Sequence, residues 1–213
     1  MPPSIPPSVR GWEWKGTMAR TQAADYEERR EAIVERAAEL FAQRGFLGAS
    51  VSDIARACNT SKSLLYHYYP SKEDVLYAVM ASHIDRLVED VESVESGPGG
   101  ADERLRRLLH LFMEHYVGAA SRQKVLLNEL DNLPDDKRTS IVARQRRLVD
   151  AVQKLLVEAD PSLAGDKGRA RARTMLLFGM INWTGNWYDP AGAVKPGEIA
   201  EMALEMVLRP VGR

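Results

Sequence analysis

Apolar residues recur at helical spacing along most of this chain. Stripes in which apolar side chains return every three or four positions cover residues 33–41, 76–91, 105–117, 141–156 and 199–207. No segment alternates between apolar and polar residues as a half-buried strand would. The pattern therefore predicts an all-α protein of about nine helices, with helix from Tyr26 onward.

The first residues break this pattern. Residues 1–17 are rich in proline and have no periodicity, so we expect a disordered leader over residues 1–20, with Met18 as an alternative start. Of the 213 residues, 45% are hydrophobic and 28% charged, the formal net charge is −1, and one residue is a cysteine. This composition is typical of a globular protein and excludes a disulfide framework or a thiolate zinc site. No apolar stretch is long enough to cross a membrane.

The most informative segment, residues 45–75, reads GFLGASVSDIARACNTSKSLLYHYYPSKEDV. Gly45 is expected to end the first helix in a left-handed conformation. Ser50 and Asp53 have capping-box spacing and open a short helix, and Asn59 suits a tight turn with positive φ. Ser61 can cap a second short helix. Two short helices around a tight turn predict a helix-turn-helix, and the outward positions of the second are Lys62, Ser63, Tyr66 and His67.

Residues 26–75 resemble the DNA-binding domain of the TetR-type (tetracycline-repressor-like) regulators. The resemblance rests on FAQRGF, SVSDIA and SKSLLYHYYPSKED in that order, with Tyr69 where the family usually has Phe. It implies a three-helix DNA-binding domain over residues 21–72 and a helical ligand-binding and dimerisation domain over residues 73–213. The implied DNA-binding residues are Ser50, Ser61, Lys62, Ser63, Tyr66, His67 and Lys72. Of these, Lys62 and Ser63 would reach base edges, Tyr66 and Lys72 would hold phosphates, and His67 could do either.

The resemblance also implies that the chain acts as a homodimer on a palindromic double-stranded operator. The last two helices, expected at about residues 169–188 and 196–208, would form the interface. The sequence supports this, because residues 175–183 are apolar around nearly the whole circumference of a helix.

The C-terminal half, with NELDNLPDDKRTSIVARQRR and NWTGNWY, resembles a TetR-type subgroup that responds to acyl-CoA thioesters. The resemblance implies a repressor that is released by an acyl-CoA or aryl-CoA inducer. The candidate ligand-binding residues are Leu109, Phe112, Met113, Tyr116, Leu127, Trp183, Asn186 and Trp187, and interface packing is the alternative for the tryptophans. The cations available for CoA phosphates are Arg104, Arg106, Arg107, Arg146 and Arg147.

Other functions receive less support. No nucleophile motif, phosphate loop or metal-ligand spacing appears, so neither an enzyme nor a metal or other cofactor is expected. A TetR-type sensor of cationic drugs would need buried acids, for which Glu114, Glu129 and Asp131 are the candidates. An architectural DNA-binding protein without an inducer is a further alternative. We expect a cytoplasmic, nucleoid-associated bacterial protein without a membrane partner. The operator, the inducer, and repression versus activation stay open.

Overall fold

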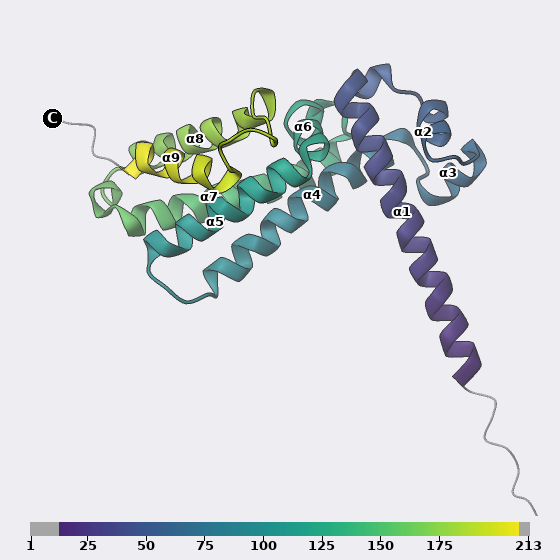
Figure 1. Ribbon diagram of the computed structural model, residues 1–213, viewed down its shortest axis with the longest axis horizontal. Helices are drawn as coiled ribbons and strands as arrows, with labels where there is room; N and C mark the ends of the chain where they lie inside the picture. The colour runs from purple at the N-terminus through teal and green to yellow at the C-terminus, as the bar shows by residue number, and fades with distance from the viewer. Residues whose placement is uncertain (1–12, 209–213) are drawn as a thin grey trace, which may run out of the picture.

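The computed structural model describes residues 13–208, and every regular element in this range is helical (Figure 1). The three-helix N-terminal unit consists of α1 (Glu13–Gly48), α2 (Val51–Ala57) and α3 (Lys62–Tyr68). The helices that follow are α4 (Lys72–Glu95), α5 (Ala101–Gly118), α6 (Ala120–Asn128), α7 (Asp135–Ala159), α8 (Lys167–Trp183) and α9 (Pro196–Leu208). Short 3-10 helices η1 (Leu130–Asn132), η2 (Pro161–Leu163) and η3 (Thr184–Asn186) lie in the connections. The predicted all-α fold is confirmed.

Helix α1 is longer than the sequence pattern predicts. It begins at Glu13, so residues 13–20 are helical and do not form the disordered leader expected there, whereas residues 1–12 lie outside the described residues. The N-terminal part of α1 extends away from the rest of the molecule (Figure 1). Near its other end, Gly45 has a φ of 71°, which kinks the helix. A side chain at this angle would be strained, and the positive φ predicted for Gly45 is confirmed. The helix does not end there as predicted, because α1 continues past the kink to Gly48.

The N-terminal unit has its own small core. Phe41 from α1, Ile54 from α2 and Leu65 from α3 are all buried, and Phe41 packs against the ring of Phe46 at 5.5 Å between centroids. These contacts fix the two short helices on α1, because each is too short to be stable alone.

Helix α4 joins this unit to the C-terminal body. Its first turn is capped by Ser71, whose hydroxyl oxygen accepts a hydrogen bond from the Asp74 N–H at 3.0 Å. Along its length α4 packs against α1, α5, α6 and α7. A tilt of α4 would therefore change how the N-terminal unit sits on the body.

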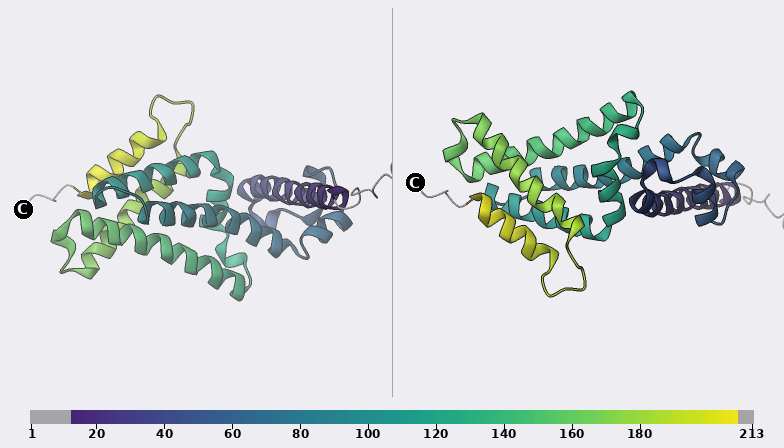
Figure 2. Two further views of the ribbon diagram at one scale, coloured as in Figure 1. Left: turned by 90° about the horizontal axis from the view of Figure 1, so that it is seen from below. Right: turned by 90° about the horizontal axis from the view of Figure 1, so that it is seen from above.

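The C-terminal body is a bundle with the helix-turn-helix at one end (Figures 1 and 2). In it α5 packs against α7 and α9, and α8 packs against α7 and α9. Helix α6 lies at the junction of the two parts, where it packs against both α1 and α4. In the described part of the chain, no helix is long and apolar enough to span a membrane.

The end of α8 corrects one expectation. The sequence predicted a helix up to about Tyr188, but α8 ends at Trp183 and the 3-10 turn η3 follows. The Thr184 hydroxyl donates to the Ile181 carbonyl at 2.6 Å, and Gly185 is a weak helix former, so the local sequence favours leaving the helix there. Trp183 and Trp187 therefore do not share one helical face.

Candidate functional site

The helix-turn-helix has the predicted local geometry. The Ser50 hydroxyl oxygen accepts from the Asp53 N–H at 3.2 Å, and the Ser50 N–H donates to the Asp53 carboxylate at 3.0 Å. These two bonds form a capping box, as the sequence predicted. Asn59 has a φ of 50° in the turn between α2 and α3. The sharp turn holds α3 at a fixed angle to α2.

Helix α3 presents a polar face to solvent. Leu65 anchors it in the core, whereas Lys62, Ser63, Tyr66 and His67 are exposed. Within the described part of the chain, the side chains of Lys62, Ser63 and Tyr66 make no hydrogen bond or ion pair, so their polar groups are available to a partner. His67 differs, because its ring packs edge-on against Tyr26 at 6.3 Å and Tyr68 at 5.5 Å.

Three of the predicted DNA-binding residues have bonds inside the protein. The Ser50 hydroxyl donates to Asp53 Oδ2 at 2.5 Å, and the Ser61 hydroxyl oxygen accepts from the Leu64 N–H at 3.1 Å. Lys72 Nζ donates to the carbonyls of Phe46 at 2.8 Å and Ala49 at 3.0 Å. Two of the three N–H groups of Lys72 thus tie the start of α4 to the turn between α1 and α2, a role that the sequence did not predict. Its ammonium group also lies 4.0 Å from the centroid of the Phe46 ring.

Two adjoining cavities lie in the C-terminal body. The larger has a volume of about 240 Å³ and is mostly apolar, with Leu87, Leu148 and Phe178 in its wall. The smaller, of about 170 Å³, lies between α5, α6 and the segment after α8, and Lys124 and Asn128 line it. The residues that line both cavities are Tyr116, Gln123, Leu127 and Asn182.

The predicted ligand-binding residues divide into three groups. Tyr116 and Leu127 line both cavities, and Asn186 lines the smaller one. Leu109, Phe112 and Met113 line neither, because they are fully buried in the core. Trp183 and Trp187 also line neither cavity and are exposed by 65% and 58%. These five side chains therefore lie outside the walls of the two cavities.

The sequence reasoning missed Gln123 and Asn182, which connect the walls of the cavities. Gln123 Oε1 lies 2.7 Å from His83 Nε2, and Gln123 Nε2 donates to Asn182 Oδ1 at 3.2 Å. Burial raises the pKa of Tyr116 above its ordinary value, and the side chain of Gln123 partly offsets this. Burial lowers the pKa of His83 to about 4, so its ring is neutral near pH 7. A signal was present, since Arg122 and Gln123 occupy the buried positions of α6 together with Val125 and Leu126.

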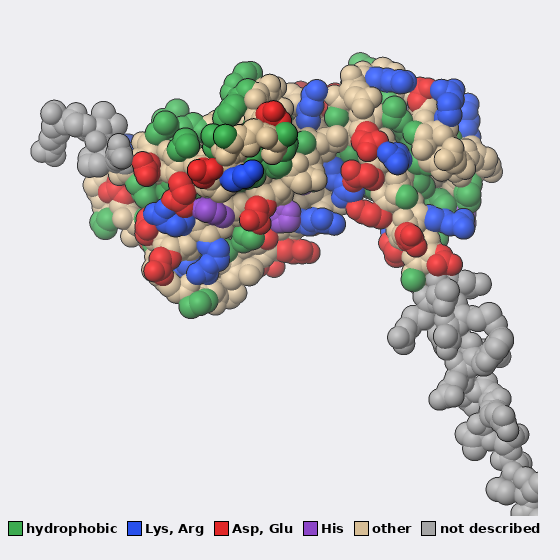
Figure 3. Space-filling model, in the orientation of Figure 1, with side chains coloured by type: hydrophobic (Ala, Val, Ile, Leu, Met, Phe, Trp, Pro, Cys, Tyr) green, Lys and Arg blue, Asp and Glu red, His purple; other side chains and the backbone are tan. Residues whose placement is uncertain are grey.

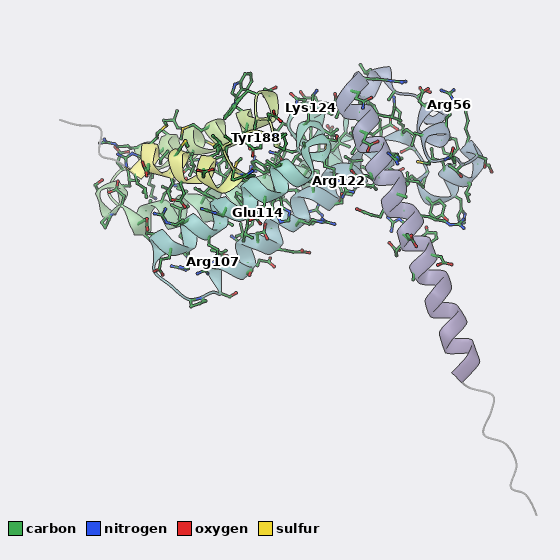
Figure 4. All side chains as sticks on the ribbon, viewed as in Figure 1. Arg56, Arg107, Glu114, Arg122, Lys124 and Tyr188 are labelled. Atoms are coloured by element: carbon green, nitrogen blue, oxygen red, sulfur yellow. The ribbon has the colours of Figure 1, made fainter. Side chains whose placement is uncertain are left out.

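The charged side chains that line the two cavities are of one sign among the described residues. Among the described residues, no Asp or Glu lines either cavity, and Lys124 is the one cation in their walls. Neither Glu114, which Figure 4 labels on α5, nor Glu129 nor Asp131 reaches them. Four of the five arginines proposed for CoA phosphates have other bonds: Arg104 pairs with Glu158, Arg106 with Glu201, Arg107 with the Pro98 carbonyl and Arg147 with Glu95. Neither of these two cavities is the buried acidic site that a cationic drug would need.

Arg122, directly before Gln123, connects α6 to the N-terminal unit (Figure 4). Its side chain is only 6% exposed, and its Nη2 lies 2.6 Å from both Glu31 Oε1 and Glu35 Oε2 of α1. Its Nη1 also donates to the Ser82 hydroxyl of α4 at 3.2 Å. We call Arg122, Glu31 and Glu35 the α1–α6 clamp. Arg122 of the clamp and Gln123 of the cavity wall are thus adjacent residues of the short helix α6.

An apolar surface lies on the outer side of α8 and α9. Its members are exposed although they are hydrophobic, and they are Met175, Leu176, Trp183, Met202 and Met206. Figure 3 shows hydrophobic side chains gathered over this part of the body. A contiguous apolar patch of this kind usually marks an interaction site.

Family models match both parts of the chain. Residues 33–79 match the model described as bacterial regulatory proteins of the tetR family. Residues 98–211 match the model described as the tetracyclin repressor-like C-terminal domain. The two matches cover the helix-turn-helix and the helical body that carries the cavities.

Solved structures and characterised proteins resemble the chain over most of its length. A TetR-family transcriptional regulator from Bordetella parapertussis 12822 is 41% identical, with a TM-score of 0.82, and the match covers 85% of this chain and 95% of that one. AibR, in complex with isovaleryl coenzyme A and operator DNA, is 29% identical with a TM-score of 0.73 over 84% and 97%. The HTH-type transcriptional repressor KstR2 of Mycobacterium tuberculosis H37Rv is 25% identical over 87% of this chain and 94% of its own length.

Proposed function

Because this chain belongs to the tetracycline-repressor (TetR) family, we propose that it is a repressor that an acyl-CoA or aryl-CoA thioester releases from its operator. Family membership makes the chain a transcriptional regulator and not an enzyme. In this proposal it binds a palindromic operator as a homodimer, in the bacterial cytoplasm at the nucleoid. The repressor KstR2, similar over most of its length, supports repression rather than activation.

The exposed face of α3 supports docking into a major groove. Lys62 and Ser63 at the start of α3 would reach base edges, and the Tyr66 hydroxyl would hold a phosphate. Tyr66→Phe should then weaken binding to all DNA by a similar factor, whereas Ser63→Ala should change the preference between operators. Titrations at one salt concentration test this, because affinities at different salt cannot be compared. Unchanged affinity and selectivity in both variants would contradict this docking.

The apolar surface on α8 and α9 supports a homodimer. Leu176 and Met206 are 65% and 68% exposed in the single chain, although both are large hydrophobic residues. A second copy that packs its own α8 and α9 against this surface would bury it with two-fold symmetry. The two α3 helices would then meet half-sites about 34–36 Å apart, or a multiple of this spacing.

The lining of the cavities is the observation that carries the effector class. The apolar cavity can take an acyl or aryl group, and the smaller polar cavity with Lys124 can take the polar arm that follows. AibR, whose structure contains isovaleryl coenzyme A, supports this class by its similarity. A cationic-drug sensor has less support, because no carboxylate lines either cavity. An architectural DNA-binding protein would have no use for the cavities.

The adjacent positions of Arg122 and Gln123 suggest how occupancy reaches the DNA. A ligand lowers operator affinity only if it binds better to a dimer whose recognition helices are misplaced. A ligand that displaces Gln123 moves α6, and α6 holds α1 through the clamp. Since α1 carries the helix-turn-helix, its orientation follows the state of the cavity.

The proposal is tested with one operator and a panel of effectors. The operator is selected from a genomic library with the full-length dimer, and its release is followed by fluorescence anisotropy. The panel contains short and long acyl-CoAs, aryl-CoAs, free CoA and cationic drugs. Release by acyl-CoA or aryl-CoA but not by free CoA or the drugs is the expected result. Release by the cationic drugs alone, or by no compound, would overturn the effector class.

A further inference from the structure

A ring of polar side chains separates the two cavities. Tyr116 from α5, Gln123 from α6 and Asn182 from α8 line both the apolar and the polar cavity. We call these three residues the polar neck. Gln123 is 5% exposed and Tyr116 is 6% exposed, whereas Asn182 is half-buried, so most of the neck is shielded from bulk water. Such groups are costly unless they have hydrogen-bond partners.

The hydrogen bonds inside the protein decide which polar groups of the neck are available to a ligand. Gln123 Oε1 can only accept, so the neutral ring of His83 donates to it from Nε2. The Gln123 amide donates to Asn182 Oδ1. The carbonyl oxygen of Gln123 and one of its amide hydrogens are thus engaged within the protein. The hydroxyl hydrogen of Tyr116 and the amide hydrogens of Asn182 have no acceptor within the described part of the chain.

The neck therefore offers the Tyr116 hydroxyl and the Asn182 amide to a ligand as donors. These donors lie where the apolar cavity meets the polar cavity. They therefore face the point of a bound ligand at which its apolar group joins its polar arm. In a thioester, the atom at this point is the carbonyl oxygen, which is an acceptor. A carboxylate would bring a full charge into this site, where no Lys or Arg of the larger cavity compensates it.

The volume of the apolar cavity limits the acyl group. A cavity of about 150 Å³ holds one benzene molecule, so a cavity of about 240 Å³ fits an acyl group of roughly six to nine carbons. A group of this size would fill the apolar cavity and leave its carbonyl at the neck.

We infer that the polar neck recognises the carbonyl oxygen of the effector, with the Tyr116 hydroxyl as the donor that selects a thioester over a carbonyl-free analogue. This inference rests on the proposed function, since it assigns the specificity of the same site. The structural alternative is that the Tyr116 hydroxyl only interacts with Gln123 and stabilises the fold. The two roles differ in their effect on ligand discrimination.

The test compares thioesters with thioethers of the same length. The probes are hexanoyl-CoA and phenylacetyl-CoA, with S-hexyl-CoA and S-(2-phenylethyl)-CoA as the matched analogues in which CH2 replaces the carbonyl. Binding to the full-length dimer is measured by isothermal titration calorimetry for the wild type, Tyr116→Phe and Tyr188→Phe. Tyr188 is the matched control, because it lines the smaller cavity while its hydroxyl donates to the Val194 carbonyl at 3.0 Å. Melting curves check that each variant is folded.

The expected result is that the wild type binds a thioester at least about tenfold more tightly than its thioether. Tyr116→Phe should bring this ratio to within about twofold, and Tyr188→Phe should leave it unchanged. Equal binding of thioester and thioether to the wild type would overturn the inference but not the effector class. A preference that survives in Tyr116→Phe would also overturn it. Binding of none of the four compounds would instead contradict the proposed function, and the inference with it.

Discussion

Removing the two acidic residues of the α1–α6 clamp should uncouple effector binding from operator release. Glu31 and Glu35 both meet the guanidinium of Arg122, at 2.6 Å each, and Gln123 beside it lines both cavities. The double change Glu31→Gln and Glu35→Gln removes the ion pairs but keeps side-chain size. Both side chains are half exposed, and each glutamine oxygen can still accept from the guanidinium of Arg122, so the variant should remain folded.

The expected magnitude follows from the exposure of the three side chains. An ion pair between exposed groups contributes about 0.2–1 kcal/mol, and the buried guanidinium of Arg122 places these pairs near the upper end. Two pairs together give about 1–2 kcal/mol, which corresponds to a factor of roughly 5–30 in an equilibrium constant. The coupling ratio is the operator Kd with saturating effector divided by the Kd without it. We expect this ratio to fall by that factor in the double variant, while affinity for the effector changes little.

The assay is fluorescence anisotropy of a labelled operator at fixed salt, with and without saturating acyl-CoA. The matched control is Glu27→Gln with Glu39→Gln, which removes two charges from the same helix. These carboxylates pair with Arg30 and Arg36, three residues away within α1, and do not reach α6. A coupling ratio within twofold of the wild type in the clamp variant would refute the reasoning. So would an equal fall in the control.

Three further perturbations probe the fold and the assembly. Lys72→Met should lower the free energy of unfolding, measured by urea denaturation, by about 1–3 kcal/mol, because it leaves the Phe46 and Ala49 carbonyls without their donor. The control Lys62→Met should change this free energy by less than about 0.5 kcal/mol. Burial holds the pKa of His83 at about 4, below its value near 6.5 in the unfolded chain. As the pH falls, His83 is therefore protonated in the unfolded chain before it is protonated in the folded protein. The wild type should therefore lose up to about 3 kcal/mol more stability than His83→Gln between pH 6.5 and pH 4, and equal losses would contradict this origin. Leu176→Glu should give a folded monomer by analytical ultracentrifugation and circular dichroism, with operator binding lost; a stable dimer would place the interface elsewhere.

The helix-turn-helix was predictable in detail because its determinants are local. The caps at Ser50 and Ser61 act on N–H groups three residues away, and Asn59 needs only its own backbone angle. The exposed face of α3 follows from the one buried leucine, since a two-turn helix anchored at Leu65 must turn its other side outward. Even here, the role of Lys72 was missed, because its acceptors lie 23 and 26 residues away in the chain.

The cavities were less predictable for a physical reason. Leu109, Phe112, Met113 and Tyr116 share one apolar stripe on α5, but only Tyr116 lines a cavity. Helical periodicity indicates which side of a helix faces inward. It does not indicate where the neighbouring helices leave space, because that depends on how α6, α7 and α8 pack against this side.

The partners of Arg122 in the α1–α6 clamp cannot be predicted from local sequence patterns. A buried arginine is costly unless it is paired, so the position of Arg122 in the buried stripe of α6 already requires an acidic partner. The sequence offers 30 acidic residues, and the two that pair with Arg122 lie 87 and 91 positions away on another helix. Nothing in the spacing selects them, whereas the packing of α6 on α1 does. A residue that couples two domains must bridge segments that are distant in sequence, so coupling residues are the ones that local patterns reveal last. The polar residues of a buried stripe are therefore the positions at which to look for coupling in a helical regulator of this kind.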